Sequence, residues 1–210
     1  MKRLITTALL AAPLFAMATP VNLVTNGSFE STTVNNGTWT IVDAATGWTV
    51  GPQGLEIRNN VAGTAASGVN FAELDTTTNS WISQSLATVA GYTYTLSFSY
   101  ANRPDHQGAN SNGLNWSIGD LSGTVGQNTT TSWATFTTTF IGTGSPMTLR
   151  FGAIGRSDGY GTSLDNISVT TQNAGGNANG VPEPQSIALL LAALGAMGLV
   201  ARRRKQAGKA

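Results

Sequence analysis

The sequence predicts an all-β protein: an antiparallel β-sandwich (jelly roll) with a signal helix before it and a transmembrane sorting helix after it. Residues 21–171 alternate apolar and polar side chains with a period of two, and no stretch there has a convincing helical period. Asn-Gly turn signals separate the alternating runs. Long apolar runs without this alternation lie only at the two ends of the chain. These observations together predict the fold class.

Three segments carry the clearest strand pattern. Residues 92–100 alternate Tyr, Leu and Phe with Thr and Ser, as a half-buried antiparallel strand does. Residues 147–153 repeat the alternation, and Ala134, Phe136 and Phe140 line one face of a third strand. About ten short strands in about 150 residues indicate a sandwich of two sheets.

Charge is segregated along the chain. Seven of the eleven basic residues lie near the ends, whereas residues 21–180 hold four arginines and nine acidic residues, a net charge of −5. An acidic domain without lysine offers no surface for nucleic acid, so nucleic acid is excluded as a partner. The chain has no cysteine, which excludes disulfides and thiolate metal sites.

The first 18 residues have the features of a signal peptide. Two basic residues precede an apolar stretch that closes on Ala16-Met17-Ala18. This small-x-small pattern is the one that signal peptidase accepts, so we expect export and removal of residues 1–18.

The C-terminus carries three ordered features after an Asn/Gly linker at 172–180. They are the residues Val181, Pro182, Glu183 and Pro184, an apolar run at 187–201, and the cluster Arg202, Arg203, Arg204 and Lys205. The apolar run predicts a thin membrane-spanning helix, and the cluster predicts a cytoplasmic C-terminus. From the residues alone, a permanent anchor and a processed tail stay equal alternatives.

Residues 181–205 resemble the PEP-CTERM sorting signal of Gram-negative, exopolysaccharide-producing bacteria. The resemblance rests on the order Pro-Glu-Pro, apolar helix and basic cluster at the very end of the chain. It implies recognition by an exosortase, a membrane cysteine protease that processes the tail near Pro-Glu-Pro. It also implies a location in the cell envelope, at the outer surface, or in the extracellular matrix.

The central domain resembles the galactose-binding-like jelly rolls that many carbohydrate-binding modules share. The segments that carry this resemblance are residues 22–30 (NLVTNGSFE), 82–94 and 164–169 (LDNISV). Uncharacterised sandwich domains of PEP-CTERM proteins, related to a plant cell-wall domain family, are closer still through segments 71–75 and 100–104. The resemblance implies a glycan-binding module.

The same resemblance implies a structural Ca²⁺ site. In the resembling modules a carboxylate after the first strand and an aspartate opening the last strand help bind the ion, which corresponds here to Glu30 and Asp165. Asp165 shares strand parity with Ile167 and Val169, which would turn it inward, and a buried carboxylate needs a cation or hydrogen-bond donors. The alternative is that both carboxylates accept backbone N–H bonds or pair with arginine.

Exposed aromatic rings that stack on sugars are the first candidates for ligand binding. Trp81 leads, because it lies on the opposite face of strand 81–86 from Ile82 and Leu86. The further aromatic candidates are Trp39, Trp48, Trp116 and Tyr160. For any one tryptophan the alternative is a place in the core, where large aromatics usually lie.

A second set of candidates is charged: Glu56, Glu73, Asp75 and Arg103. They form either a ligand-binding rim or an internal salt-bridge network, and the sequence leaves both open. Catalysis is not expected. The single histidine, His106, has no Ser or Cys nucleophile motif around it, and nothing singles out Glu56 and Glu73 as a glycosidase pair.

The sequence thus predicts an exported, non-catalytic cell-surface or matrix protein with a glycan-binding module. We expect weak binding of neutral or mildly charged polysaccharide. The expected partners are signal peptidase and exosortase during processing, polysaccharide, and the membrane before processing. The alternatives are a structural or adhesive protein that binds other proteins, and a glycan-active hydrolase.

Overall fold

A computed structural model describes residues 20–105, 110–127 and 130–171. The predicted signal peptide, the linker, the sorting segment and His106 lie outside the described residues. Within the described part, no helix has the length and apolar character needed to cross a membrane.

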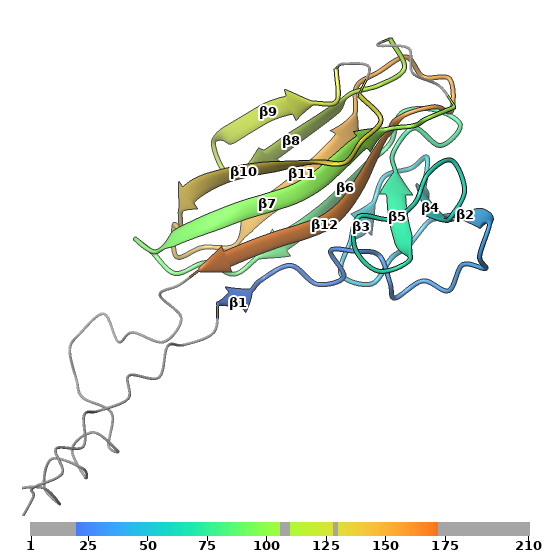
Figure 1. Ribbon diagram of the computed structural model, residues 1–210. Helices are drawn as coiled ribbons and strands as arrows, with labels where there is room; N and C mark the ends of the chain where they lie inside the picture. Colours follow the sequence, from blue (N-terminus) through green and yellow to red (C-terminus); the bar gives the residue numbers. More distant parts are fainter. Residues whose placement is uncertain (1–19, 106–109, 128–129, 172–210) are drawn as a thin grey trace, which may run out of the picture. The chain divides into compact units, whose positions relative to one another are not determined.

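The described residues fold into strands joined by turns and loops (Figure 1). The strands are β1 (Val21–Asn22), β2 (Thr38–Val42), β3 (Thr49–Val50), β4 (Leu55–Asn59), β5 (Asn70–Glu73), β6 (Trp81–Leu86), β7 (Thr93–Asn102), β8 (Leu114–Ile118), β9 (Leu121–Val125), β10 (Ala134–Ile141), β11 (Met147–Ala153) and β12 (Thr162–Thr171).

Two antiparallel sheets form the domain. The seven-stranded sheet has the order β10-β7-β12-β5-β4-β2, with β1 paired to β12, and the five-stranded sheet has the order β3-β6-β11-β8-β9. The inner faces meet at Phe98 of β7 and Phe151 of β11, whose ring centroids lie 4.9 Å apart. The predicted all-β, two-sheet antiparallel architecture is confirmed.

The predicted alternation of β7 places its large side chains in the core. Tyr94, Leu96 and Phe98 are each at most 2% exposed. The Phe98 ring also stacks on Phe136 of β10 at 5.1 Å, as the predicted third strand requires. Burial of these apolar faces, which stabilises the fold by about 25 cal/mol per Å² removed from water, holds the two sheets together.

A bulge in β12 changes the parity of its first half. The pairing of β12 with β7 shifts register between Asp165 and Ser168, and Asn166 has a positive φ of 49°. The Ile167 N–H donates to the Gly27 carbonyl at 2.9 Å, and a Cβ at Gly27 would collide with the Ile167 carbonyl. A bulge inserts one residue, so Asp165 does not share a face with Val169, contrary to the expected parity.

Candidate ligand-binding sites

A cluster of charged side chains lies on the outer face of the seven-stranded sheet. In the antiparallel register, Trp39 of β2 pairs with Arg58 of β4, and Glu56 of β4 pairs with Glu73 of β5. Directly opposed residues project from the same face of a sheet. The alternate residues of β4, Leu55 and Ile57, are fully buried in the core. The period of two therefore separates the charged cluster from the core.

Ion pairs join the cluster into one network. Arg58 Nε lies 2.6 Å from Glu56 Oε1, and Arg58 Nη2 pairs with Glu73 Oε2. Arg103 Nη1 lies 3.5 Å from Glu73 Oε1, and Arg103 Nε lies 2.8 Å from Asp105 Oδ1. Of the two readings of these charged residues, the salt-bridge network is therefore present, and it joins Glu56, Glu73 and Arg103.

Glu73 is the most deeply buried acid of the network, with 0% exposure. Burial raises its pKa to about 7, although the guanidinium groups of Arg58 and Arg103 lower it. Its Oε1 also accepts a hydrogen bond from the Gly161 N–H at 2.9 Å. The carboxyl group therefore changes its charge near neutral pH.

The network borders a cavity of about 360 Å³. Two exposed aromatic side chains, Trp39 at 54% and Tyr160 at 38%, contribute to its wall. Glu56, Arg58 and Arg103 line it between them. We call this cavity the Trp39–Tyr160 pocket. Its combination of exposed rings and fixed charges is what recognition of a polar ligand with an apolar face requires.

One buried donor of this pocket lacks a partner among the described residues. Arg58 is 1% exposed, and its Nη1 has no hydrogen-bond acceptor there. Leaving such a donor unsatisfied costs about 1–3 kcal/mol. Arg58 lines the Trp39–Tyr160 pocket, but Nη1 itself is shielded from solvent.

Asp75 holds the loop that carries Tyr160. Its Oδ2 accepts hydrogen bonds from the N–H groups of Asp158 at 3.0 Å and Gly159 at 3.1 Å. Asp75 is 1% exposed and is not among the residues that line the pocket, and burial raises its pKa. Asp75 therefore does not line the ligand pocket as predicted; it positions the loop that carries Tyr160. Tyr160 in turn lies against Arg103, whose Cζ is 4.8 Å from the ring centroid.

Trp81 lies on the other sheet. In β6, Ile82 and Leu86 are buried, whereas Trp81 is half-buried on the opposite face, as its parity predicted. The Arg150 guanidinium of β11 lies over the indole, with Cζ 4.2 Å from the ring centroid. Trp81 and Trp39 therefore belong to two separate surfaces.

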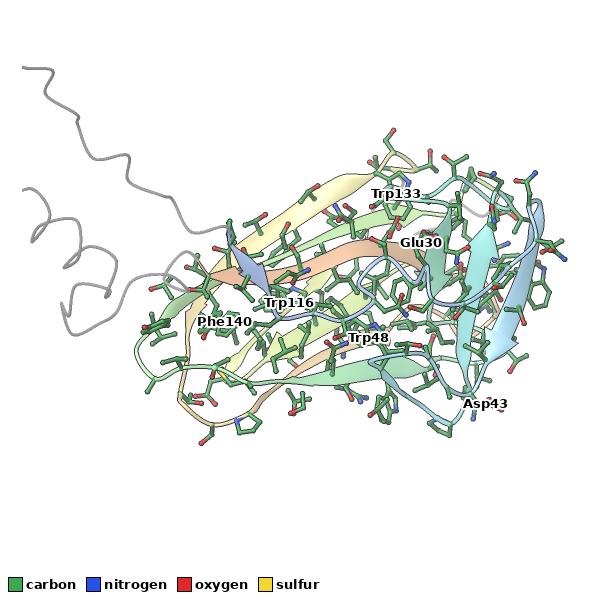
Figure 2. The ribbon with its side chains drawn as sticks, turned by 90° about the horizontal axis from the view of Figure 1, so that it is seen from below. Glu30, Asp43, Trp48, Trp116, Trp133 and Phe140 are labelled. Atoms are coloured by element: carbon green, nitrogen blue, oxygen red, sulfur yellow. The ribbon has the colours of Figure 1, made fainter. Side chains whose placement is uncertain are left out.

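Trp48 and Trp116 are core residues. Each is 6% exposed; Trp48 stacks on Phe29 at 6.1 Å, and Trp116 packs on Phe136 at 4.8 Å (Figure 2). The Trp48 Nε1 donates to the Asn26 carbonyl at 3.1 Å. Neither indole is therefore an exposed ring of the kind expected for stacking on a sugar, although Trp116 lines a small hollow beside β9.

Glu30 and Asp165 bind backbone rather than each other. Glu30 Oε1 accepts from the N–H groups of residues 69 and 70 at 2.9 and 2.8 Å, and Asp165 Oδ2 accepts from residues 66 and 67 at 2.8 Å each. Burial raises the pKa of Asp165 to about 6. Among the described residues, no three His, Cys, Asp or Glu side chains gather as a metal site.

Sequence reasoning missed two residues of the Trp39–Tyr160 pocket, Arg58 and Asp105, and one tryptophan outside it. Arg58 was not a candidate, because alternation marks it only as a polar residue of a strand. Asp105, which pairs with Arg103, gave no signal of its own. Trp133 packs edge-on against Phe71 at 6.0 Å and donates from Nε1 to the Thr64 carbonyl at 2.8 Å. Each of these roles depends on a partner distant in the sequence.

The fold and the pocket define a two-sheet antiparallel β-domain with a ligand-sized polar cavity. The chain belongs to the DUF642 family, described as a protein of unknown function, which matches residues 22–170. Residues 180–205 match the PEP-CTERM protein-sorting motif. The sorting tail predicted at 181–205 is thereby confirmed, and it implies an exported, envelope-sorted protein. No curated protein is similar to the chain in sequence.

Several solved structures are similar to the domain. TmCBM61 in complex with beta-1,4-galactotriose is 16% identical, covers 71% of this chain and 97% of its own, and has a TM-score of 0.46. Family 16 carbohydrate binding module-2 is 16% identical, with coverages of 70% and 99% and a TM-score of 0.44. A family 35 carbohydrate binding module from Clostridium thermocellum is 15% identical, with coverages of 72% and 98% and a TM-score of 0.43. With TM-scores below 0.5, these likenesses carry no inference about what this chain binds.

Proposed function

We propose that this protein is an exported glycan-binding protein whose Trp39–Tyr160 pocket holds a neutral sugar. The observation that carries the proposal is the pairing of two exposed aromatic rings with a buried network of carboxylates and guanidinium groups in one cavity of about 360 Å³. A pyranose has an apolar C–H face, which packs on an aromatic ring, and hydroxyl groups, which bond to charged side chains.

The charges of the pocket favour a neutral ligand. Carboxylates exceed guanidinium groups around it, since Glu56, Asp105 and Asp158 line it beside Arg58 and Arg103. Sugar hydroxyls donate to the carboxylate oxygens that line the pocket. An anionic group would meet this excess of negative charge at close range.

The pocket binds rather than hydrolyses. A glycosidase needs one carboxyl group to protonate the leaving oxygen and a second carboxylate to act as nucleophile or base. Here Glu56 and Glu73 both pair with the same guanidinium group of Arg58, and Glu73 is fully buried. Neither is placed to exchange a proton with a glycosidic bond.

Export and sorting complete the proposal. Signal peptidase removes residues 1–18, and an exosortase of a Gram-negative bacterium processes the tail near Pro182-Glu183-Pro184. The basic cluster Arg202-Arg203-Arg204 orients the tail in the membrane before processing. The domain then functions in the envelope or in the surrounding polysaccharide.

Binding of the mature protein to an array of neutral oligosaccharides tests this function. Trp39→Ala should weaken binding by about fivefold, since one stacking contact contributes about 1 kcal/mol. Ile141→Ala, which truncates another exposed apolar side chain of the same sheet, is the matched control and should bind like the wild type. If no neutral glycan binds, the structural or adhesive alternative takes over. Turnover of labelled oligosaccharides would establish the hydrolase instead.

A further inference from the structure

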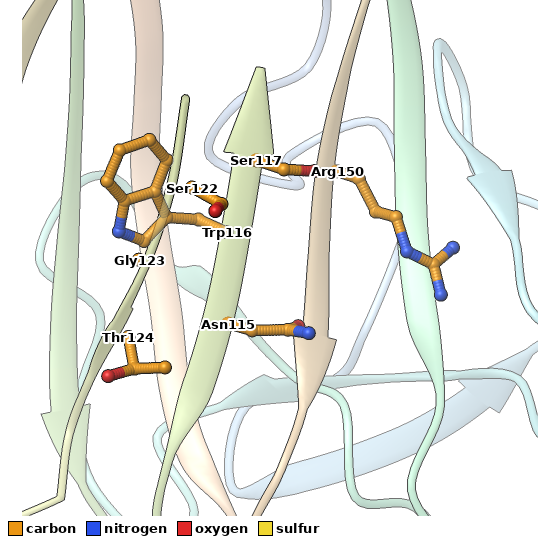
Figure 3. Close-up of a pocket in the computed structure, with 7 residues that line it drawn as sticks. All are labelled: Asn115, Trp116, Ser117, Ser122, Gly123, Thr124 and Arg150. Carbon is orange, nitrogen blue, oxygen red and sulfur yellow. The ribbon is translucent and has the colours of Figure 1, made fainter. Parts of the chain in front are cut away.

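The outer face of the five-stranded sheet carries a row of small polar side chains around one cation. Arg150 of β11 pairs with Ser83 of β6 on one side and with Ser117 of β8 on the other. The neighbouring row on the same face contains Trp81, Gly152 and Asn115. Figure 3 shows Asn115, Ser117 and Arg150 on one side of β8 and the Trp116 indole on the other.

The Asn115 amide fills the space above Gly152. A Cβ at this position would lie 2.6 Å from Asn115 Oδ1 and 3.6 Å from the Trp81 Cβ. The Trp81 indole lies on the other side of β6, where a Cβ at Gly51 would come within 2.8 Å of its Nε1. A hollow of about 250 Å³ lies on the other side of Arg150, lined by Asn115 and Ser117. This face thus combines an aromatic ring, an amide and hydroxyl groups.

Arg150 has no anionic partner in the part of the chain described. It makes no ion pair and no side-chain hydrogen bond there, and its one contact of this kind is the cation–π contact with Trp81. None of the strand positions on this face is acidic, and Asp120 in the β8–β9 turn makes no ion pair with Arg150. Arg58 and Arg103, in contrast, are both paired with carboxylates.

Stacking on Trp81 leaves the hydrogen-bonding edge of the Arg150 guanidinium available. The ring contacts the flat face of the guanidinium, whereas its N–H donors lie in the guanidinium plane and match the two oxygens of a carboxylate. The contact also restricts the rotamers of Arg150, which lowers the entropy lost on binding.

We infer that this Trp81–Arg150 face is a second binding site, which takes the carboxylate of a uronate in an acidic polysaccharide. This site goes beyond the proposed function, because the Trp39–Tyr160 pocket favours neutral sugars and lies on the other sheet. The uronate carboxylate binds Arg150, which Trp81 holds in place, and the uronate hydroxyls bond to Asn115 and the serines of the face. The strands of this sheet carry no Asp or Glu, which distinguishes this surface on a domain whose net charge is negative.

Binding of alginate, a polyuronate, to the mature full protein tests the inference. Affinity electrophoresis should show retardation by alginate, none by carboxyl-reduced alginate of the same length, and a retardation that weakens with added salt. Arg150→Gln should weaken alginate binding by about tenfold, the usual effect of losing one charge-assisted contact. Arg156→Gln removes an equal charge from an exposed loop position and should leave binding unchanged.

Two further arms keep the inference separate from the proposed pocket and from folding. Trp39→Ala should retain alginate binding. If this variant loses alginate binding, the polyuronate binds in the Trp39–Tyr160 pocket, and the second site is overturned. In the wild type, the Trp81 indole N–H resonance, assigned with Trp81→Phe, should shift on addition of oligouronate. An unshifted Trp81 resonance, equal retardation by carboxyl-reduced alginate, or an Arg150→Gln variant that binds normally would each overturn the inference. If a sulfated glycan without uronate residues binds as well as alginate, the assignment of the ligand as a uronate is overturned.

Discussion

Arg58 links the core of the domain to its candidate binding surface. Its backbone belongs to β4, next to the fully buried Ile57, and its guanidinium pairs with Glu56 and Glu73. Burying the Arg58 charge costs free energy of desolvation, whereas the pocket needs charged groups in fixed positions. The cost is distributed over several partners, and it shows as the raised pKa of Glu73.

The titration of Glu73 predicts a fall in stability as the pH rises. Its pKa is about 7 in the folded state and about 4.5 in the unfolded chain, so the folded state holds more protons between these values. The free energy of unfolding should therefore decrease from pH 5 to pH 8, by a few kcal/mol at most, at about 1.4 kcal/mol per pKa unit. Urea denaturation at several pH values measures this.

A variant assigns that fall to Glu73. Asp165 contributes a fall of the same sign, which ends near its folded pKa of about 6. Glu73→Gln should therefore flatten the profile between pH 6 and pH 8, while Asp120→Asn, an exposed carboxylate in a turn, should retain the wild-type slope. A wild-type stability that rises over this range would contradict the assignment.

At the scale of the elements, the first and last strands close the domain. β1 pairs with β12, and the bulge at Asn166 directs the Asp165 carboxylate away from Val169, onto the loop N–H groups of residues 66 and 67. Glu30 accepts from the N–H groups of residues 69 and 70, where this loop enters β5. The resemblance implied that these carboxylates bind a structural ion, and here they fix a loop over the sheet. The hydrogen bonds to backbone N–H groups that the sequence offered as the alternative are present.

Calcium at Glu30 and Asp165 stays a prediction. Ca²⁺ should raise the melting temperature relative to chelator, because an ion bound only by the folded state stabilises it. Asp165→Ala should abolish the increment. That variant should also lower stability in chelator by about 1–3 kcal/mol, since three backbone N–H groups lose their acceptor. Identical wild-type melting curves in calcium and chelator would leave the two carboxylates with their backbone role alone.

At the scale of the whole molecule, the sorting motif and the domain have separate roles in export. The motif at 180–205 implies export, and the domain at 22–170 is the part that the route delivers. The excess of acidic residues in the domain and of basic residues at the ends fits this division. Binding surfaces on both sheets would let one exported domain contact two kinds of glycan chain.

Processing predicts the mass of the mature protein. Protein recovered from the envelope or medium should lack residues 1–18 and the segment after Pro182-Glu183-Pro184, as intact mass spectrometry measures. Replacing Glu183 by Ala should leave the tail attached, whereas Gln185→Ala, next to the motif, should be processed normally. A wild-type species that retains Arg202 to Lys205 would contradict processing, though not export.

The period of two determined a large part of this protein from sequence alone. The alternation of β7 and β6 assigned Leu96, Phe98 and Ile82 to the core and Trp81 to the opposite face, because strand parity is a local property of the backbone. The tail at 180–205 could also be recognised from the sequence, because its motif is defined by the order of residue types along the chain. The charged residues Glu56, Glu73 and Arg103 were also singled out, but not their arrangement.

Only the tertiary structure decided which of these residues meet. Trp39, Arg58, Arg103 and Tyr160 come from separate strands and loops, and the register between non-adjacent segments brings them to one pocket. Trp116 shares strand parity with the buried Leu114 and Ile118, so the local alternation already marked it as core, whereas Trp48 lies outside the strands and only the tertiary packing buries it. One inserted residue at Asn166 reversed the face of Asp165. Strand pairing between distant segments and the position of a bulge depend on the packing of the whole sheet, whereas the alternation of apolar and polar side chains is visible in a few consecutive residues.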